Sequence, residues 1–189
     1  TGRVRDAKGT TVEVAVRVPI VIRYPAVVNP GVISTLNAMT INILPTVVEL
    51  TGGVAPTRKI DGQSMIPFLE DRITKEKEEN RPLFFWYHRG NLESMLLRNW
   101  KLHFPHKYRS LENREPGNNG IPAKYNYQMQ QPLALYDLSK DPAETTNVAE
   151  NHPEVMKKLL QMADKARKEL GDRLTKVEGS ENRPPGKVE

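Results

Sequence analysis

The sequence predicts an α/β fold in two parts, and three patterns along its 189 residues support this. A run rich in β-branched residues over 12–24 is typical of a strand buried on both faces, as in a large mixed or parallel sheet. Segments between residues 83 and 138 alternate apolar and polar side chains between turns, which predicts a small antiparallel sheet. A long amphipathic helix follows. We therefore expect strand and helix elements of a mixed-sheet domain, then an antiparallel sheet packed with a C-terminal helix.

The first part should contain one helix after the predicted strand. It is expected to begin after Thr40 or Asn42, to tolerate Pro45 in its first turn, and to end at Gly52. Asp61-Gly62 then marks a turn that leads into a short helical turn. The predicted apolar stripe of the helix is Ile43, Leu44, Val47, Val48 and Leu50.

A highly charged connector over 70–82 is the best candidate for a boundary between the two parts. We therefore place one domain at 1–70 and a second at 81–171. Residues 172–189 are polar and contain Pro and Gly, so we expect a tail that lies on the surface or is disordered.

The second part has four predicted strands, at 83–88, 92–97, 100–104 and 133–138. Residues 105–132 are rich in Pro, Gly and Asn and predict a long loop, which in compact domains is usually functional or disordered. The closing helix should begin at Pro153, where a missing N–H costs least, and end at Gly171.

Composition excludes several classes of protein. The chain has no cysteine, so it holds no disulfide, thiolate metal site or cysteine nucleophile, and its four histidines show no metal-ligand spacing. No apolar run approaches the length of about 18 residues needed to span a membrane. The net charge of +5 is spread among 23 acidic residues without a groove-reading helix or stacking motif, so we expect no nucleic-acid partner.

A charged, glycine-containing stretch near the start is followed by the β-branched run. Residues 5–19 read Arg-Asp-Ala-Lys-Gly-Thr-Thr-Val-Glu-Val-Ala-Val-Arg-Val-Pro. This stretch resembles the lysine loop of the type I sulfatases, the formylglycine-dependent arylsulfatase family. Val14 and Ala15 stand where the family has two glycines. The residues that fall on the family pattern are Arg5, Lys8, Glu13, Arg17 and Pro19.

Later segments resemble the same family in the same order. Residues 135–149 read Leu-Tyr-Asp-Leu-Ser-Lys-Asp-Pro-Ala-Glu-Thr-Thr-Asn-Val-Ala, close to the family's Leu-Tyr-Asp-Leu-x-x-Asp-Pro-x-Glu-x-x-Asn-Leu-Ala. We interpret this motif as a strand and turn with a structural role. Residues 41–46, 87–93 and 100–104 are also similar to the family. The resemblance implies an alkaline-phosphatase-like sulfatase fold, with 1–70 as the end of the catalytic domain and 81–171 as the C-terminal subdomain.

The resemblance also implies a chemistry, hydrolysis of a sulfate ester on a small molecule or a sulfated glycan. A formylglycine made within Cys/Ser-x-Pro-x-Arg attacks the sulfur, and calcium held by Asp and Asn polarises the sulfate. Neither that motif nor the metal ligands are in this sequence, so we expect them in an N-terminal part of the same protein and expect the chain alone to be inactive. The family further implies a periplasmic or secreted location.

Three residues are our candidate site. Lys8 matches the lysine that acts in the family, and we predict a catalytic contact with the sulfate. His103 and His106 lie in a basic run before the long loop and are predicted to bind substrate. A core hydrogen bond is the alternative interpretation of His103. Glu13 is predicted to orient the loop as the ionic partner of a nearby base.

Two other functions remain open. A degenerate, non-catalytic module could bind a sulfated glycan or another partner, which Val14, Ala15 and the missing nucleophile would favour. A phosphatase or phosphonate hydrolase of the same superfold is the other alternative, because a fold alone does not separate sulfate from phosphate.

Overall fold

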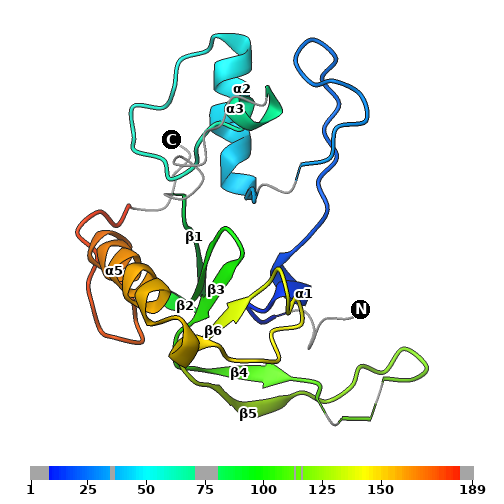
Figure 1. The fold of residues 1–189 in the computed structure, drawn as a ribbon, viewed down its shortest axis with the longest axis vertical. Coiled ribbons are helices and arrows are strands. Elements are labelled where there is room, and N and C mark those ends of the chain that lie inside the picture. The colour runs from blue at the N-terminus through cyan, green and yellow to red at the C-terminus, as the bar shows by residue number, and fades with distance from the viewer. Residues whose placement is uncertain (1–8, 35–36, 71–80, 113, 116, 184–189) are drawn as a thin grey trace. The chain divides into compact units, whose positions relative to one another are not determined.

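A computed structural model describes residues 9–34, 37–70, 81–112, 114, 115 and 117–183. The chain divides into two compact units (Figure 1). Residues up to Val18 and from Pro82 onward form one, here called the sheet unit. Residues from Pro19 to Arg81 form the other, here called the helix–loop unit.

The sheet unit is built on a four-stranded antiparallel sheet in the order β1-β2-β3-β6. This confirms the predicted antiparallel sheet, and its strands are close to the predicted ranges. The alternation of side chains along each strand gives the sheet two distinct faces. The strands are β1 (Leu83–Tyr87), β2 (Asn91–Leu97), β3 (Trp100–His103) and β6 (Ala134–Asp137).

Helix α5 (Pro153–Leu170) begins and ends where the sequence predicts, with proline in its first turn and Gly171 after its last residue. It lies along the four-stranded sheet (Figure 1). Burial of the apolar side chains on the facing surfaces of α5 and the sheet drives their packing. The core cluster is Leu92, Met95, Leu97, Leu102, Phe104, Leu135, Leu159 and Ala163.

The prediction of a long loop over 105–132 is wrong. Strands β4 (His106–Ser110) and β5 (Asn126–Gln131) form an antiparallel ribbon within it. Side chains of β4 alternate between buried and more exposed, as expected for a strand with one covered face. The Pro, Gly and Asn residues that favoured a loop are concentrated in the connection between these two strands.

The strand predicted over 12–24 is also wrong. Residues Glu13–Val16 form a single helical turn, α1, and residues 17–24 have no regular structure. A strand needs a neighbour for its backbone hydrogen bonds, and no described strand pairs with this segment. Val21 is 94% exposed, so the two-face burial that the composition predicted is absent among the described residues.

Residues after α5 are held to the sheet unit at several points. The carboxylate of Asp172 is buried and accepts hydrogen bonds from the backbone N–H of Leu92 and from Arg167 Nε, at 3.0 and 2.9 Å. The backbone N–H of Ser180 donates to the carbonyl of Lys168 at 2.9 Å. The described part of the predicted tail therefore starts at one buried carboxylate, and residues 173–178 after it are exposed, as expected for a tail that lies on the surface.

The helix–loop unit contains η1 (Thr40–Asn42), α2 (Ile43–Thr51) and α3 (Ile66–Leu69), which confirms the predicted helix and helical turn. Gly52 ends α2 with φ +63°. Thr46 Oγ1 accepts the backbone N–H of Met65 at 2.8 Å, which ties α2 to the start of α3. The predicted apolar stripe is not buried by the described residues of this unit, since Ile43, Leu44 and Val47 are about half exposed.

No helix within the described ranges is long and apolar enough to cross a membrane.

Candidate active site

The predicted catalytic residue, Lys8, lies outside the described residues. The four residues Thr10, Thr11, Val12 and Glu13, which begin two positions after it, are all buried in the sheet unit. The predicted lysine loop therefore leads directly into a segment that packs as part of the core.

Gly9 is in close contact with a cation from β4. Its φ of +95° favours glycine, and a Cβ at this position would overlap the guanidinium of Arg109. The guanidinium also lies 4.6 Å from the centre of the Tyr125 ring. A second positive charge is thus placed against the residue that follows Lys8.

Glu13 is paired with a buried lysine. Lys101 Nζ donates to Glu13 Oε1 at 3.0 Å and lies 4.2 Å from the centre of the Phe85 ring. The Lys101 side chain has no exposed surface. This confirms Glu13 as the ionic partner of a base, although the sequence did not indicate which base. Val14 and Ala15, which replace the family's glycines, lie within α1.

Glu144 binds the same segment from the turn after β6. Its Oε2 accepts the backbone N–H of Glu13 at 2.8 Å, and its Oε1 lies 2.7 Å from His103 Nε2. Burial acts to raise the pKa of Glu144, but the hydrogen bond from His103 and the charge of Lys101 lower it overall. The group is therefore an ionised, buried carboxylate.

His103 makes a hydrogen bond in the core, which confirms the alternative interpretation of this residue. Burial lowers its pKa to about 4, against the opposing effect of Glu144. The imidazole is therefore neutral at pH 7, and its Nε2–H donates to the Glu144 carboxylate. Its Nδ1 has no hydrogen-bond partner among the described residues.

His106 lies beside His103 and faces a different carboxylate. Its Nδ1–H donates to the carbonyl oxygen of Phe104 at 2.7 Å, and its Nε2 lies 3.3 Å from Glu93 Oε2. Burial raises the pKa of Glu93 to about 7, with a hydrogen bond from Asn91 opposing it. Both predicted histidines are thus buried, and their substrate-binding role stays a prediction.

Alternation along β3 explains the arrangement of this site. Leu102 packs in the core cluster with α5, so Lys101 and His103 point to the opposite face of the strand, toward Glu13 and Glu144. Sequence reasoning missed the roles of Lys101 and Glu144. The signal for Lys101 was its position two residues before His103, and the signal for Glu144 was the Asp-Pro-x-Glu motif.

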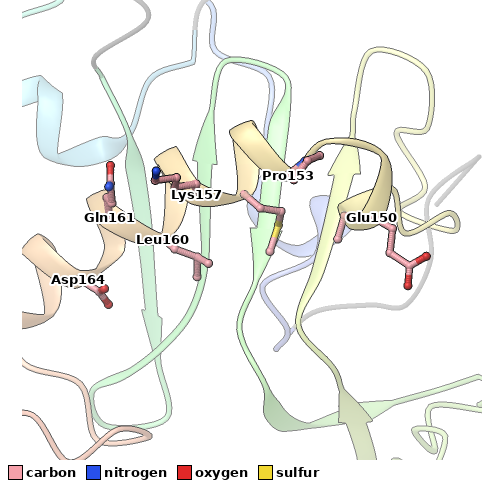
Figure 2. Close-up of a pocket in the computed structure, with 8 residues that line it drawn as sticks. Glu150, Pro153, Lys157, Leu160, Gln161 and Asp164 are labelled. Atoms are coloured by element: carbon pink, nitrogen blue, oxygen red, sulfur yellow. The ribbon is translucent and has the colours of Figure 1, made fainter.

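A surface depression on helix α5 does not form a site. A shallow depression along η2 (Ala149–Asn151) and α5 is lined mainly by one helix face, without polar groups converging on a point (Figure 2). No group of three or more potential metal ligands occurs in the part of the chain that the structure describes. Calcium requires about six to eight oxygen ligands, and the described residues do not bring such a set together. We therefore assign no step to a metal here.

Comparisons with known proteins give the class first. A solved structure from a Bacteroides thetaiotaomicron locus for the metabolism of multiple glycosaminoglycans aligns with a TM-score of 0.61 and 24% identity, covering 88% of this chain and 32% of that one. A second, solved with its substrate D-glucosamine-2-N,6-O-disulfate, has a TM-score of 0.56 and 20% identity, covering 84% and 30%. The fold is the C-terminal part of the alkaline-phosphatase-like sulfatase fold.

Sequence comparisons then give the family. The C-terminal region of aryl-sulfatase matches residues 78–184, and the C-terminal region of N-sulphoglucosamine sulphohydrolase matches residues 7–109. Arylsulfatase A of Homo sapiens is 32% identical over 86% of this chain, and a sulfatase of Formosa agariphila is 29% identical over 79%. The chain belongs to the sulfatase family and corresponds to the C-terminal portion of its members. It spans 32% and 26% of the length of these two relatives.

Proposed function

We propose that this chain is the C-terminal part of a sulfatase that hydrolyses sulfate esters, and that it supplies Lys8 to the active site. The observation that carries this proposal is the family's lysine pattern, directly followed by a segment built into the core of the sheet unit. The formylglycine nucleophile and a calcium site would come from an N-terminal part of the same protein. A periplasmic or secreted location accords with this assignment.

Lys8 would act as an electrostatic contact for the sulfate. Its ammonium is a compact positive charge with three hydrogen-bond donors. Such a group stabilises an oxygen that gains negative charge in the transition state, whether this is a sulfate oxygen or the bridging ester oxygen. A positioned donor of this kind accelerates the chemical step more than it tightens substrate binding.

Arg109 would add a second anion contact in the same region. Its guanidinium rests on Gly9, and Lys107 of the same strand is exposed. A guanidinium beside the Tyr125 ring, with an exposed lysine on the same strand, suits a sulfated sugar, which offers anionic groups and apolar ring faces. The names of the matched structures, which mention glycosaminoglycans and a glucosamine disulfate, support this class of substrate.

The test is Lys8→Ala in the full-length protein, with an aryl sulfate as substrate. We expect kcat to fall by about 10²- to 10³-fold, the loss typical of one transition-state donor. Lys157→Ala, a lysine on the exposed side of α5, is the matched control and should retain the wild-type rate. A Lys8→Ala enzyme with unchanged kcat would contradict the proposal.

Three measurements separate this function from its alternatives. A non-catalytic module, favoured by Val14 and Ala15 in place of glycines, would bind heparin without hydrolysing any sulfate ester, and mass spectrometry of the full-length protein would find no formylglycine. A phosphatase or phosphonate hydrolase would turn over the matching aryl phosphate or phosphonate faster than the aryl sulfate.

A further inference from the structure

A buried set of four side chains joins the lysine loop to the C-terminal sheet. Its members are Glu13, Lys101, His103 and Glu144, here called the loop anchor. We propose that Glu144 is a positioning residue of the sulfatase reaction, which holds the segment after Lys8 so that the lysine meets the sulfate. This inference rests on the proposed function, because it assigns Glu144 its effect through Lys8.

Two contacts fix Glu13 at once. Its backbone N–H donates to Glu144 Oε2 at 2.8 Å, and its carboxylate accepts from Lys101 Nζ at 3.0 Å. One contact holds the main chain and the other holds the side chain. The residue therefore has little freedom to translate or rotate while the anchor is intact.

The anchor is close to Lys8 in the sequence, and described residues connect the two. Glu13 follows Lys8 by five residues, and the residues between Gly9 and Glu13 are all buried. A displacement of Glu13 cannot be absorbed by an exposed, loosely held segment. Misplacing a catalytic group by about 1 Å can lower a rate by about 100-fold.

Stability alone does not account for these residues. Burying an ion pair removes both charges from water, and well-packed apolar side chains are often as stable in its place. The backbone of Glu144 also has φ +55°, a left-handed conformation that residues other than glycine rarely adopt. Glu144 is thus both a buried charge and a residue in an unfavourable backbone conformation. We therefore expect its carboxylate to fix the position of the residues that it binds, through directed, charge-assisted hydrogen bonds.

The turn around Glu144 is built to present it. Asp141 Oδ2 accepts the backbone N–H of Thr145 at 2.7 Å and of Thr146 at 2.8 Å. These bonds close the turn around Glu144 and direct its carboxylate toward α1 and β3. The Asp-Pro-x-Glu motif thus combines a turn-forming aspartate with the glutamate that holds the loop.

The experiment compares Glu144→Ala and Glu144→Gln in the full-length protein. Glu144→Ala should lower kcat by about 10- to 100-fold with little change in KM, because substrate contacts remain while Lys8 is misplaced. Glu144→Gln should stay within about threefold of wild type. Its amide oxygen can accept from Glu13 and its NH₂ can donate to His103 Nε2, since the His103 proton can move to the unpartnered Nδ1.

Hydrogen exchange at the Glu13 amide tests the anchor without reference to activity. This amide should exchange at least tenfold faster in Glu144→Ala and close to the wild-type rate in Glu144→Gln. Leu159→Ala, which opens a cavity under α5, is the control for general loss of stability. It should lower the melting temperature and leave kcat per folded enzyme unchanged.

Combination with Lys8→Ala tests the link between the two residues. If Glu144 acts through Lys8, adding Glu144→Ala to Lys8→Ala should cause no further loss of kcat. Full additivity, or an unchanged Glu13 amide in Glu144→Ala, would overturn this inference and leave the proposed function standing. A Lys8→Ala enzyme with wild-type kcat would overturn both.

Discussion

Replacing Lys101 with methionine isolates the charge of the buried pair. The Lys101 ammonium lies 3.0 Å from Glu13 Oε1 and 4.2 Å from the centre of the Phe85 ring. Methionine keeps an unbranched chain in the same space and packs well on an aromatic ring through its sulfur. The substitution therefore preserves most of the packing, and it leaves the Glu13 carboxylate buried without its nearest cation.

The expected cost follows from what remains around Glu13. Removing one member of a buried ion pair typically costs about 3–5 kcal/mol, because the other charge stays buried. Arg17 Nη1 is 4.0 Å from Glu13 Oε2, but its side chain is 69% exposed, so it offsets only a small part of this loss. We expect Lys101→Met to lower the free energy of opening of the sheet by about 3 kcal/mol.

The double variant Lys101→Met with Glu13→Gln provides the decisive comparison. It removes both charges and keeps the backbone N–H of Glu13 on Glu144. Its expected cost is only about 1 kcal/mol, close to that of one altered hydrogen-bonding group. The double variant should therefore be more stable than Lys101→Met.

Native-state hydrogen exchange at the amides of β3 measures these free energies in the full-length protein. Lys157→Met on the exposed side of α5 is the control, and should change them by less than about 0.5 kcal/mol. Two results would refute the reasoning. One is a Lys101→Met protein as stable as wild type, and the other is a double variant whose cost equals the sum of its two single variants.

Two further predictions concern a buried acid and a glycine. Glu93 has a pKa raised to about 7, so the folded state binds more protons than the unfolded state between about pH 4.5 and 7, and this contribution to stability is lost as pH rises through 7. Glu93→Gln imitates the neutral acid beside His106, so thermal melts should show it close to wild type at pH 5 and more stable than wild type at pH 8.5. Gly9→Ala should lower kcat/KM at least tenfold, because its Cβ overlaps the Arg109 guanidinium, whereas Gly90→Ala, with φ +98° and no atom within 4 Å, should not. Equal effects of the two alanines would contradict the importance of this contact.

Periodicity predicted the parts of the fold that depend on one buried face. The sheet strands and α5 have clear apolar patterns, and the described structure confirms them. The same reasoning failed for residues 12–24, because β-branched residues form a strand only beside another strand. It also failed for β4 and β5, since a turn-rich connection hid two short strands with few apolar residues.

The candidate site was predictable only where a residue lay on a known pattern. Glu13 was expected to meet a base, but Lys101 reads as a solvent-facing residue in an alternating strand. Only the fold shows that both faces of β3 are covered. His103 could be placed in a core hydrogen bond as an alternative, while its acceptor Glu144 lies 41 residues further along the chain. The sequence around either residue does not indicate such a distant partner.

The contact between Glu13 and Glu144 gives a physical reason for two family patterns to occur in one chain. The two residues are 131 positions apart, so closing the contact costs chain entropy that no local propensity offsets. It persists because each residue completes the other, since the carboxylate satisfies a buried N–H and the N–H helps to keep the carboxylate ionised. The lysine pattern therefore contributes the donor of this contact, Glu13, and the Asp-Pro-x-Glu pattern contributes its acceptor, Glu144. On this reasoning, a sulfatase that keeps the first pattern and loses the second should have its lysine in the expected sequence position without the means to hold it there.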